Sequence, residues 1–258
     1  MNKKFCISSE NLIKVITEKT KKKENEFQIN PIVIITFSRF LIEFFKAKIT
    51  MTEDNWLMPY HPYASNPIFR GSYNNKNITI INPPMGASPI STIVEDLIFC
   101  GAKVILLACG SWAIDNNIQL LDFIIPTHAL GKDGTSIYYN RESNEHTIIN
   151  NDIVQILIKE TQRITDRFHI GKNYSLEAFY KLEKTEILKI QKSGCISMEN
   201  GELNVLATIC NSKKIKFGAL FYNYYNPLKG WNIPWLDKTY KDCINLQGEI
   251  LLNVILKV

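Results

Sequence analysis

Short, almost wholly apolar segments recur along this chain, and stretches with helical periodicity separate them. The clearest apolar segments span residues 31–36, 77–81, 103–108, 121–126 and 215–222. Segments of this length without polar alternation are typical of strands that are buried on both faces. A sheet of such strands needs helices on both sides, so the pattern predicts an α/β layered fold.

The helical stretches have recognisable starts. Ser38 is suited to cap a helix over residues 39–48, where aromatic and leucine side chains recur at helical spacing. Either Ser88 or Ser91 is expected to open a second helix that runs to Cys100. Further helices are predicted over residues 8–20, 150–168 and 238–257.

Composition excludes several classes of protein. Of the 258 residues, 45% are hydrophobic and 21% are charged, which is ordinary for a globular protein and argues against global disorder. The net charge of +5 is too mild to predict a nucleic-acid partner. No run of about 18 apolar residues predicts a membrane span, and the N-terminus lacks the apolar core of a signal peptide. We therefore expect a cytoplasmic protein with neither a membrane nor a nucleic-acid partner.

Metal binding is not predicted either. The six cysteines contain no CxxC pair, and the four histidines are isolated from one another. Cys100 and Cys109 lie in or beside apolar runs, which indicates buried free thiols.

Ligands of open α/β sheets bind at the loops that follow the carboxyl ends of the strands. In this chain those loops are residues 36–39, 83–89, 109–113 and 223–228.

These loops and the segments around them carry a series of motifs in register. They comprise Pro84–Pro89, then Gly101–Leu107 after a helix, Leu121–Thr127 followed by Asp133–Ser136, Ser175 with Phe179 and Tyr180, and Ser197–Glu199. Their order and spacing resemble the nucleoside phosphorylase and nucleosidase superfamily. The resemblance runs from about residue 31 to the C-terminus, so it implies one phosphorylase-like domain over 31–258 and an N-terminal extension over 1–30.

The resemblance implies both a fold and a chemistry. The fold is a three-layer α/β domain with a central mixed, distorted β-sheet and helices on both faces. The chemistry is cleavage of the N-glycosidic bond of a nucleoside or nucleotide, and we predict phosphorolysis to free base and ribose 1-phosphate. Two alternatives stay open: a nucleosidase that uses water, and a catalytically impaired member that binds nucleosides or regulates.

The resemblance implies candidate residues that bind the sugar and the base of the substrate. Glu199 corresponds to the carboxylate that holds the ribose 2′- and 3′-hydroxyls, and Met198 to the methionine that packs against the sugar. Phe179 corresponds to the aromatic residue that stacks on the base, and Ser111 lies in the base-binding loop. The alternatives are a carboxylate at a helix N-terminus for Glu199 and plain core packing for Met198 and Phe179.

Inorganic phosphate is the implied co-substrate, and no other cofactor is implied. Arg39, Arg70 and Gly86 match phosphate-binding positions, since guanidinium forks and main-chain amides suit phosphate oxygens. Surface salt bridges are the alternative for the two arginines. Arg70 corresponds to a residue that reaches a neighbouring subunit's site, so a homo-oligomer, either a dimer or a hexamer, is expected.

The chain also departs from the family pattern at site positions. Tyr225 falls where the purine enzymes have the aspartate that donates to the leaving base, and Asn226 follows it. A tyrosine hydroxyl or an asparagine amide can still hydrogen-bond a base, so both are candidate catalytic residues. The other departures are Leu107 in place of an arginine, Pro84 and Trp112 in place of glycines, and Ser197 in place of a glutamate.

Overall fold

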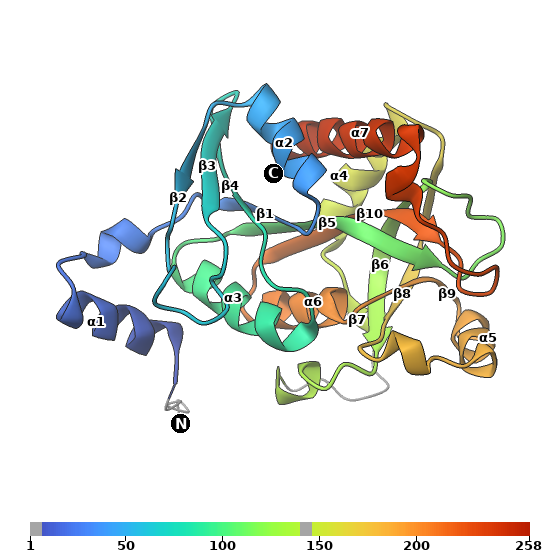
Figure 1. The fold of residues 1–258 in the computed structure, drawn as a ribbon, viewed down its shortest axis with the longest axis horizontal. Helices are drawn as coiled ribbons and strands as arrows, with labels where there is room; N and C mark the ends of the chain where they lie inside the picture. Colours follow the sequence, from blue (N-terminus) through green and yellow to red (C-terminus); the bar gives the residue numbers. More distant parts are fainter. Residues whose placement is uncertain (1–6, 140–145) are drawn as a thin grey trace.

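A computed structural model describes residues 7–139 and 146–258 of the chain (Figure 1). The helices are α1 (Ser9–Lys19), α2 (Arg39–Lys48), α3 (Ala87–Phe99), α4 (Asn151–Gln162), α5 (Lys184–Lys192), α6 (Glu202–Ser212) and α7 (Lys238–Ile255). The strands are β1 (Ile32–Thr36), β2 (Met51–Asp54), β3 (Ile68–Tyr73), β4 (Lys76–Ile81), β5 (Val104–Ala113), β6 (Phe123–Gly131), β7 (Thr147–Ile148), β8 (Phe168–Ser175), β9 (Cys195–Glu199) and β10 (Lys216–Tyr225).

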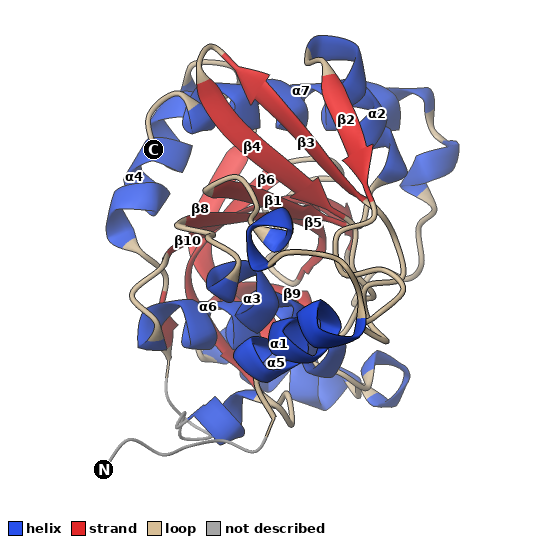
Figure 2. Ribbon diagram, turned by 90° about the vertical axis from the view of Figure 1, so that its left-hand side faces the viewer, coloured by secondary structure: helices blue, strands red, loops and turns tan. Residues whose placement is uncertain are grey.

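All of these strands belong to one sheet, in the order β10-β6-β8-β9-β5-β1-β4-β3-β2, with β7 paired to β6. β10 also pairs with β5, so five strands (β5, β10, β6, β8 and β9) close on themselves. The sheet is mixed, because β1 runs parallel to β4 and β5 while β3 runs antiparallel to its neighbours β2 and β4. Figure 2 shows β2, β3 and β4 extending from the closed part of the sheet.

Helices cover both faces of the sheet. α2 and α7 lie side by side on one face, and α3 and α6 pack together on the other (Figure 1). β1 lies between β4 and β5 with all five residues buried. The predicted α/β fold with a mixed, distorted sheet and helices on both faces is therefore confirmed.

Several predicted boundaries hold because local chemistry sets them. The hydroxyl of Ser38 accepts a hydrogen bond from the amide of Leu41, so α2 begins and ends as expected. The hydroxyl of Ser8 caps α1 in the same way by accepting from the amide of Asn11.

Other boundaries were wrong. α3 begins at Ala87 after Gly86, whose φ of +105° suits glycine, and neither Ser88 nor Ser91 opens it. The helix predicted over 150–168 ends at Gln162, because residues from Phe168 onward pair with β6 as strand β8. Strand β8 pairs with a strand that is distant in the sequence, so helical periodicity within 150–168 cannot predict it.

The N-terminal segment from residue 7 to residue 30 packs against the rest of the molecule. α1 lies on α3 and buries Ile13 and Ile16, and the indole N–H of Trp56 donates a 3.0 Å hydrogen bond to the carbonyl of Phe27. The division at residue 30 stays a prediction. No helix within the described ranges is both long and apolar enough to cross a membrane.

Candidate active site

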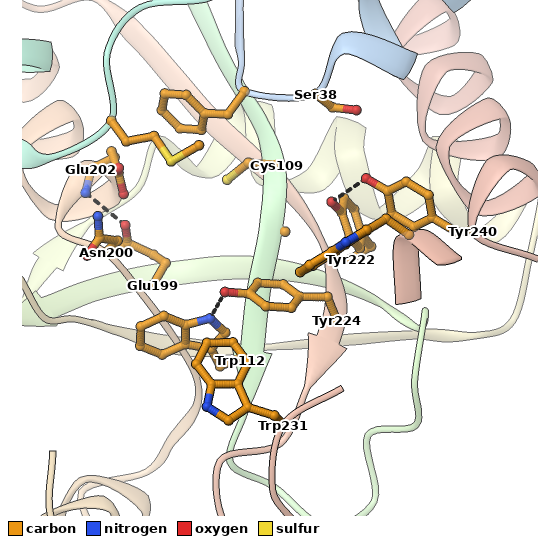
Figure 3. A pocket seen from close by; sticks show the side chains of 14 residues that line it. Ser38, Cys109, Trp112, Glu199, Asn200, Glu202, Tyr222, Tyr224, Trp231 and Tyr240 are labelled. Atoms are coloured by element: carbon orange, nitrogen blue, oxygen red, sulfur yellow. Dashed lines mark hydrogen bonds between the residues drawn. The ribbon is translucent and has the colours of Figure 1, made fainter. Parts of the chain in front are cut away.

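A cavity of about 340 Å³ opens at the carboxyl ends of the central strands (Figure 3). Side chains from the ends of β5, β9 and β10 form its walls, and the loops after β1 and β4 contribute to its rim, as the strand pattern predicted. Its lining residues are Phe37, Ser38, Met85, Cys109, Gly110, Trp112, Glu199, Asn200, Glu202, Tyr222, Tyr224, Trp231, Trp235 and Tyr240.

Glu199 is the last residue of β9, and its side chain reaches the cavity wall. Its carboxylate accepts hydrogen bonds from the hydroxyl of Ser175 and, at 2.8 Å, from the main-chain amide of Glu202. Only 3% of Glu199 is exposed. Burial first, and the neighbouring Glu202 carboxyl second, raise the pKa of Glu199 well above its usual range. Glu199 lies three residues before α6, and it accepts from the amide of Glu202, the first residue of that helix.

Glu202 is a second buried carboxylate in the same cavity, and 3% of it is exposed. One of its oxygens, Oε1, accepts a 2.7 Å hydrogen bond from the amide of Gly86, the residue that caps α3. The amide predicted to bind phosphate is therefore already paired within the chain.

Aromatic side chains form the opposite wall of the cavity. The indole N–H of Trp112 donates a hydrogen bond to the hydroxyl of Tyr224, and the two rings meet edge to face (Figure 3). Deeper in the wall, the hydroxyls of Tyr222 and Tyr240 lie 3.0 Å apart. Burial raises the pKa of the Tyr224 hydroxyl, so it stays protonated at neutral pH. A flat apolar wall with a hydroxyl suits a heterocyclic ring.

The structure places the two candidate catalytic residues beside this cavity and not in it. Side chains alternate along β10, so Tyr222 and Tyr224 face the cavity and Tyr225 faces away from it, although the pairing with β5 shifts register between Asn223 and Tyr225. Tyr225 stacks on Trp231 at 4.9 Å and lines a neighbouring cavity of about 210 Å³. The side-chain oxygen of Asn226 accepts a 2.9 Å bond from the amide of Leu228, while its buried amide nitrogen has no partner.

The remaining sugar and base candidates also lie behind the cavity wall. Met198 is fully buried and pairs in the sheet with Trp112. Phe179 packs against the indole of Trp112 with ring centroids 5.1 Å apart and lines the neighbouring cavity. Ser111 is fully buried, and its hydroxyl has no hydrogen-bond partner. The binding roles of these three residues stay predictions.

The predicted phosphate ligands are not brought together. Arg39 is the exposed first residue of α2, directly after Ser38, which lines the cavity. Arg70 lies on β3, where its Nε donates a 2.7 Å bond to the Asp54 carboxylate and another nitrogen donates to the carbonyl of Gln28. Among the described residues that line the cavity, none is a lysine or an arginine.

Several of the residues that line the cavity were not identified from the sequence. The alternation of side chains along β10 places Tyr222 and Tyr224 on one face, a signal that was present in the sequence. Glu202 and the two tryptophans Trp231 and Trp235 lie outside every motif, and only the folded chain brings them to the cavity. Within residues 7–139 and 146–258, no group of three or more histidine, cysteine or acidic side chains is placed to hold a metal ion.

Comparison with known proteins identifies the family. The sequence profile of the Phosphorylase superfamily matches residues 31–227, about three quarters of the chain. The chain therefore belongs to the phosphorylase superfamily.

Curated relatives are about a quarter identical to the chain over the aligned residues. A DeoD-type purine nucleoside phosphorylase of Shewanella oneidensis is 27% identical over 156 residues, which cover 59% of this chain and 64% of the relative. A guanosine phosphorylase of Halorubrum lacusprofundi is 24% identical over 155 residues, covering 59% and 63%. The match thus spans just under two thirds of these two relatives.

Solved structures extend the likeness to nearly the whole fold. The purine nucleoside phosphorylase of Toxoplasma gondii, solved with immucillin-H, superposes with a TM-score of 0.76 at 19% identity. That superposition covers 90% of this chain and 92% of the Toxoplasma gondii chain.

Proposed function

We propose that this protein cleaves the N-glycosidic bond of a nucleoside by phosphorolysis, which yields the free base and ribose 1-phosphate. The observation that carries the proposal is the position of Glu199. It ends a strand at the cavity, at the place where the family resemblance expects the ribose-binding carboxylate. The family membership and the phosphorylase names of the curated relatives support the same reaction.

The reaction breaks the bond between the ribose C1′ and a ring nitrogen of the base. A phosphate oxygen forms the new bond to C1′, and the bonding electron pair leaves with the base, which takes up a proton or a hydrogen bond. Positive charge develops on the ribose ring on the way, so a carboxylate that holds the ribose hydroxyls favours the transition state over the substrate. Glu199 is buried and held in place by Ser175, which gives that carboxylate a fixed position.

Tyr224 is our candidate donor to the leaving base, in place of Tyr225. The indole N–H of Trp112 is a donor only, so the Tyr224 oxygen accepts in their hydrogen bond and its own proton is available to a ligand. Trp112 and Trp231 form the flat surfaces on which a base can stack in this cavity.

Inorganic phosphate is the proposed co-substrate, and we propose no other cofactor. Arg39 is the nearest candidate cation along the chain, because it follows Ser38 at the cavity rim. We propose that the protein works as a homo-oligomer, a dimer or a hexamer, in the cytoplasm. Sedimentation at micromolar concentration tests the assembly, and a strict monomer would contradict it.

Base release from a panel of purine and pyrimidine nucleosides, with and without phosphate, tests the activity. We expect release that requires phosphate and falls at least 100-fold in kcat/KM in Glu199→Gln, which keeps the shape of the side chain. Glu249→Gln is the matched control, since Glu249 is exposed on α7 outside the cavity lining and forms a surface ion pair with Lys48. No release from any nucleoside would refute the proposal.

One observation favours a second function, hydrolysis or ligand binding without turnover. The described cavity lining has two carboxylates and no lysine or arginine, a charge balance that opposes a phosphate dianion. Base release that is equal with and without phosphate would assign hydrolysis. Tight nucleoside binding without release would assign a binding role.

A further inference from the structure

Glu202 lies where two helices begin. It is the first residue of α6, and its carboxylate bonds the amide of Gly86 at the cap of α3. Helix N-termini present unpaired amides and a partial positive charge, so they bind anions without help from a cationic side chain. At this pair of N-termini the anion is a side chain of the protein itself, and only 3% of it is exposed.

A second carboxylate, that of Glu199, binds a main-chain amide at the start of α6. Glu199 accepts a 2.8 Å bond from the main-chain amide of Glu202, so the amides of Gly86 and Glu202 are both paired to carboxylates of the same chain. Two acidic groups share this site, and the described cavity lining holds no lysine or arginine to balance them, so burial and then the Glu202 carboxyl raise the pKa of Glu199. An incoming phosphate meets both the occupied amide and the negative charge.

A glycine with positive φ precedes each of the two helix starts. Gly86 has a φ of +105° and Gly201, the residue before Glu202, has a φ of +100°. A Cβ at Gly201 would lie 3.3 Å from the Cβ of Ala87, so the starts of α3 and α6 approach closely there. The close approach of the two helix starts brings the Glu202 carboxylate within hydrogen-bond distance of the Gly86 amide, which a phosphate can accept from only if the carboxylate moves away.

We propose that Glu202 is a specificity-determining residue for the anionic co-substrate: its carboxylate occupies the Gly86 amide at the start of α3, and inorganic phosphate binds there only by displacing it. The inference rests on the proposed function only in naming phosphate as co-substrate. Its consequence is weak phosphate binding in the wild-type protein, and selection against anions that cannot compete with a buried carboxylate.

Calorimetric titration with inorganic phosphate alone, without any nucleoside, tests the inference. Glu202→Gln keeps the size of the side chain and removes its charge, and Glu202→Ala removes the competing group altogether. Glu177→Gln is the matched control, because Glu177 also accepts from a glycine amide, that of Gly134, but is exposed and outside the cavity lining. Circular dichroism and thermal denaturation verify that each variant folds.

We expect the phosphate dissociation constant to fall at least tenfold in Glu202→Gln and further in Glu202→Ala, with no change in Glu177→Gln. If the glutamine variant does not fold, the alanine variant decides. Phosphate affinities within twofold of the wild type in the folded variants would overturn the inference, and so would wild-type binding tighter than about 100 μM.

Steady-state kinetics distinguish a failure of this inference from a failure of the proposed function. If the protein is a phosphorylase, the phosphate KM falls in Glu202→Gln and stays at the wild-type value in the control Glu177→Gln. If no nucleoside is cleaved, the phosphate titration still decides the role of Glu202, because it requires no reaction.

Discussion

The indole N–H of Trp112 on β5 donates a hydrogen bond to the hydroxyl of Tyr224 on β10, and this bond ties two neighbouring strands together at the wall of the cavity. Only 3% of Trp112 is exposed, so its N–H has little access to water if the hydroxyl is removed. We predict that Tyr224→Phe lowers the free energy of unfolding by about 1–3 kcal/mol, the cost of a buried unpaired donor. Urea denaturation measures this. Tyr138→Phe, at a side chain that is 82% exposed, serves as the control and should stay within about 0.5 kcal/mol of the wild type.

Gly110 controls the width of the cavity. A Cβ at this position would lie 2.7 Å from Cδ1 of Tyr224 and 3.0 Å from Cζ of Tyr222, so both rings must move. We predict that Gly110→Ala raises the nucleoside KM at least tenfold and costs about 1–3 kcal/mol of stability. Gly134→Ala is the control, because its nearest neighbour, Oε2 of Glu177, lies 3.7 Å away. Steady-state kinetics on both variants measures the difference, and equal KM values would contradict the prediction.

Glu199 makes stability depend on pH. Its pKa is raised in the folded state by burial and then by Glu202, while Cys109 and Tyr224, which also face the pair, are neutral. A raised carboxyl pKa carries no penalty below the unfolded-state value. The penalty grows as pH rises above that value and is complete once pH passes the folded-state pKa.

We therefore predict that Glu199→Gln, which mimics the protonated form, is more stable than the wild type at pH 8 by at least about 1 kcal/mol and is equal to it near pH 4. Thermal and urea denaturation over this range give the comparison. A stability difference that does not change with pH would show that the folded-state pKa is not raised.

Arg70 is predicted to act within its own subunit. Its guanidinium joins β3 to Asp54 on β2 and to the carbonyl of Gln28 in the N-terminal segment. Because the Asp54 side chain is 36% exposed, the ion pair itself contributes little, and most of the cost of Arg70→Met comes from the lost main-chain contact, about 1–2 kcal/mol in total. Hydrogen exchange in residues 24–30 should increase. A phosphate KM that rises tenfold instead would restore the role in a neighbouring site that the family resemblance implied.

The buried thiols are predicted to resist alkylation. Burial raises the pKa of Cys100 and of Cys243 to about 12, and both side chains are almost inaccessible. Since the thiolate is the reactive form, neither should react with iodoacetamide at pH 8 in the folded protein, and both should react in urea. Peptide mapping by mass spectrometry follows each cysteine separately. Rapid modification of either in the native state would contradict its burial.

Local chemistry let the sequence predict much of the fold. Apolar runs specify β1 and the buried part of β4 because strands buried on both faces are mostly apolar, and Ser38 sets the start of α2 by capping it. The motif order also led to the family and to Glu199 at the cavity. In each case the information lies within a few residues of the chain.

Tertiary structure decided the composition of the cavity. The pairing of β10 with β5, which joins segments more than 100 residues apart, brings Tyr224 beside Trp112 at the cavity wall. The contact between Glu202 and Gly86 joins two helix starts that are 116 residues apart. Which side chain faces a cavity depends on strand register and helix approach, and the packing of the whole sheet fixes both. The sequence therefore determined the fold and the family, while the three-dimensional packing determined that two carboxylates and a wall of aromatic rings meet at its centre.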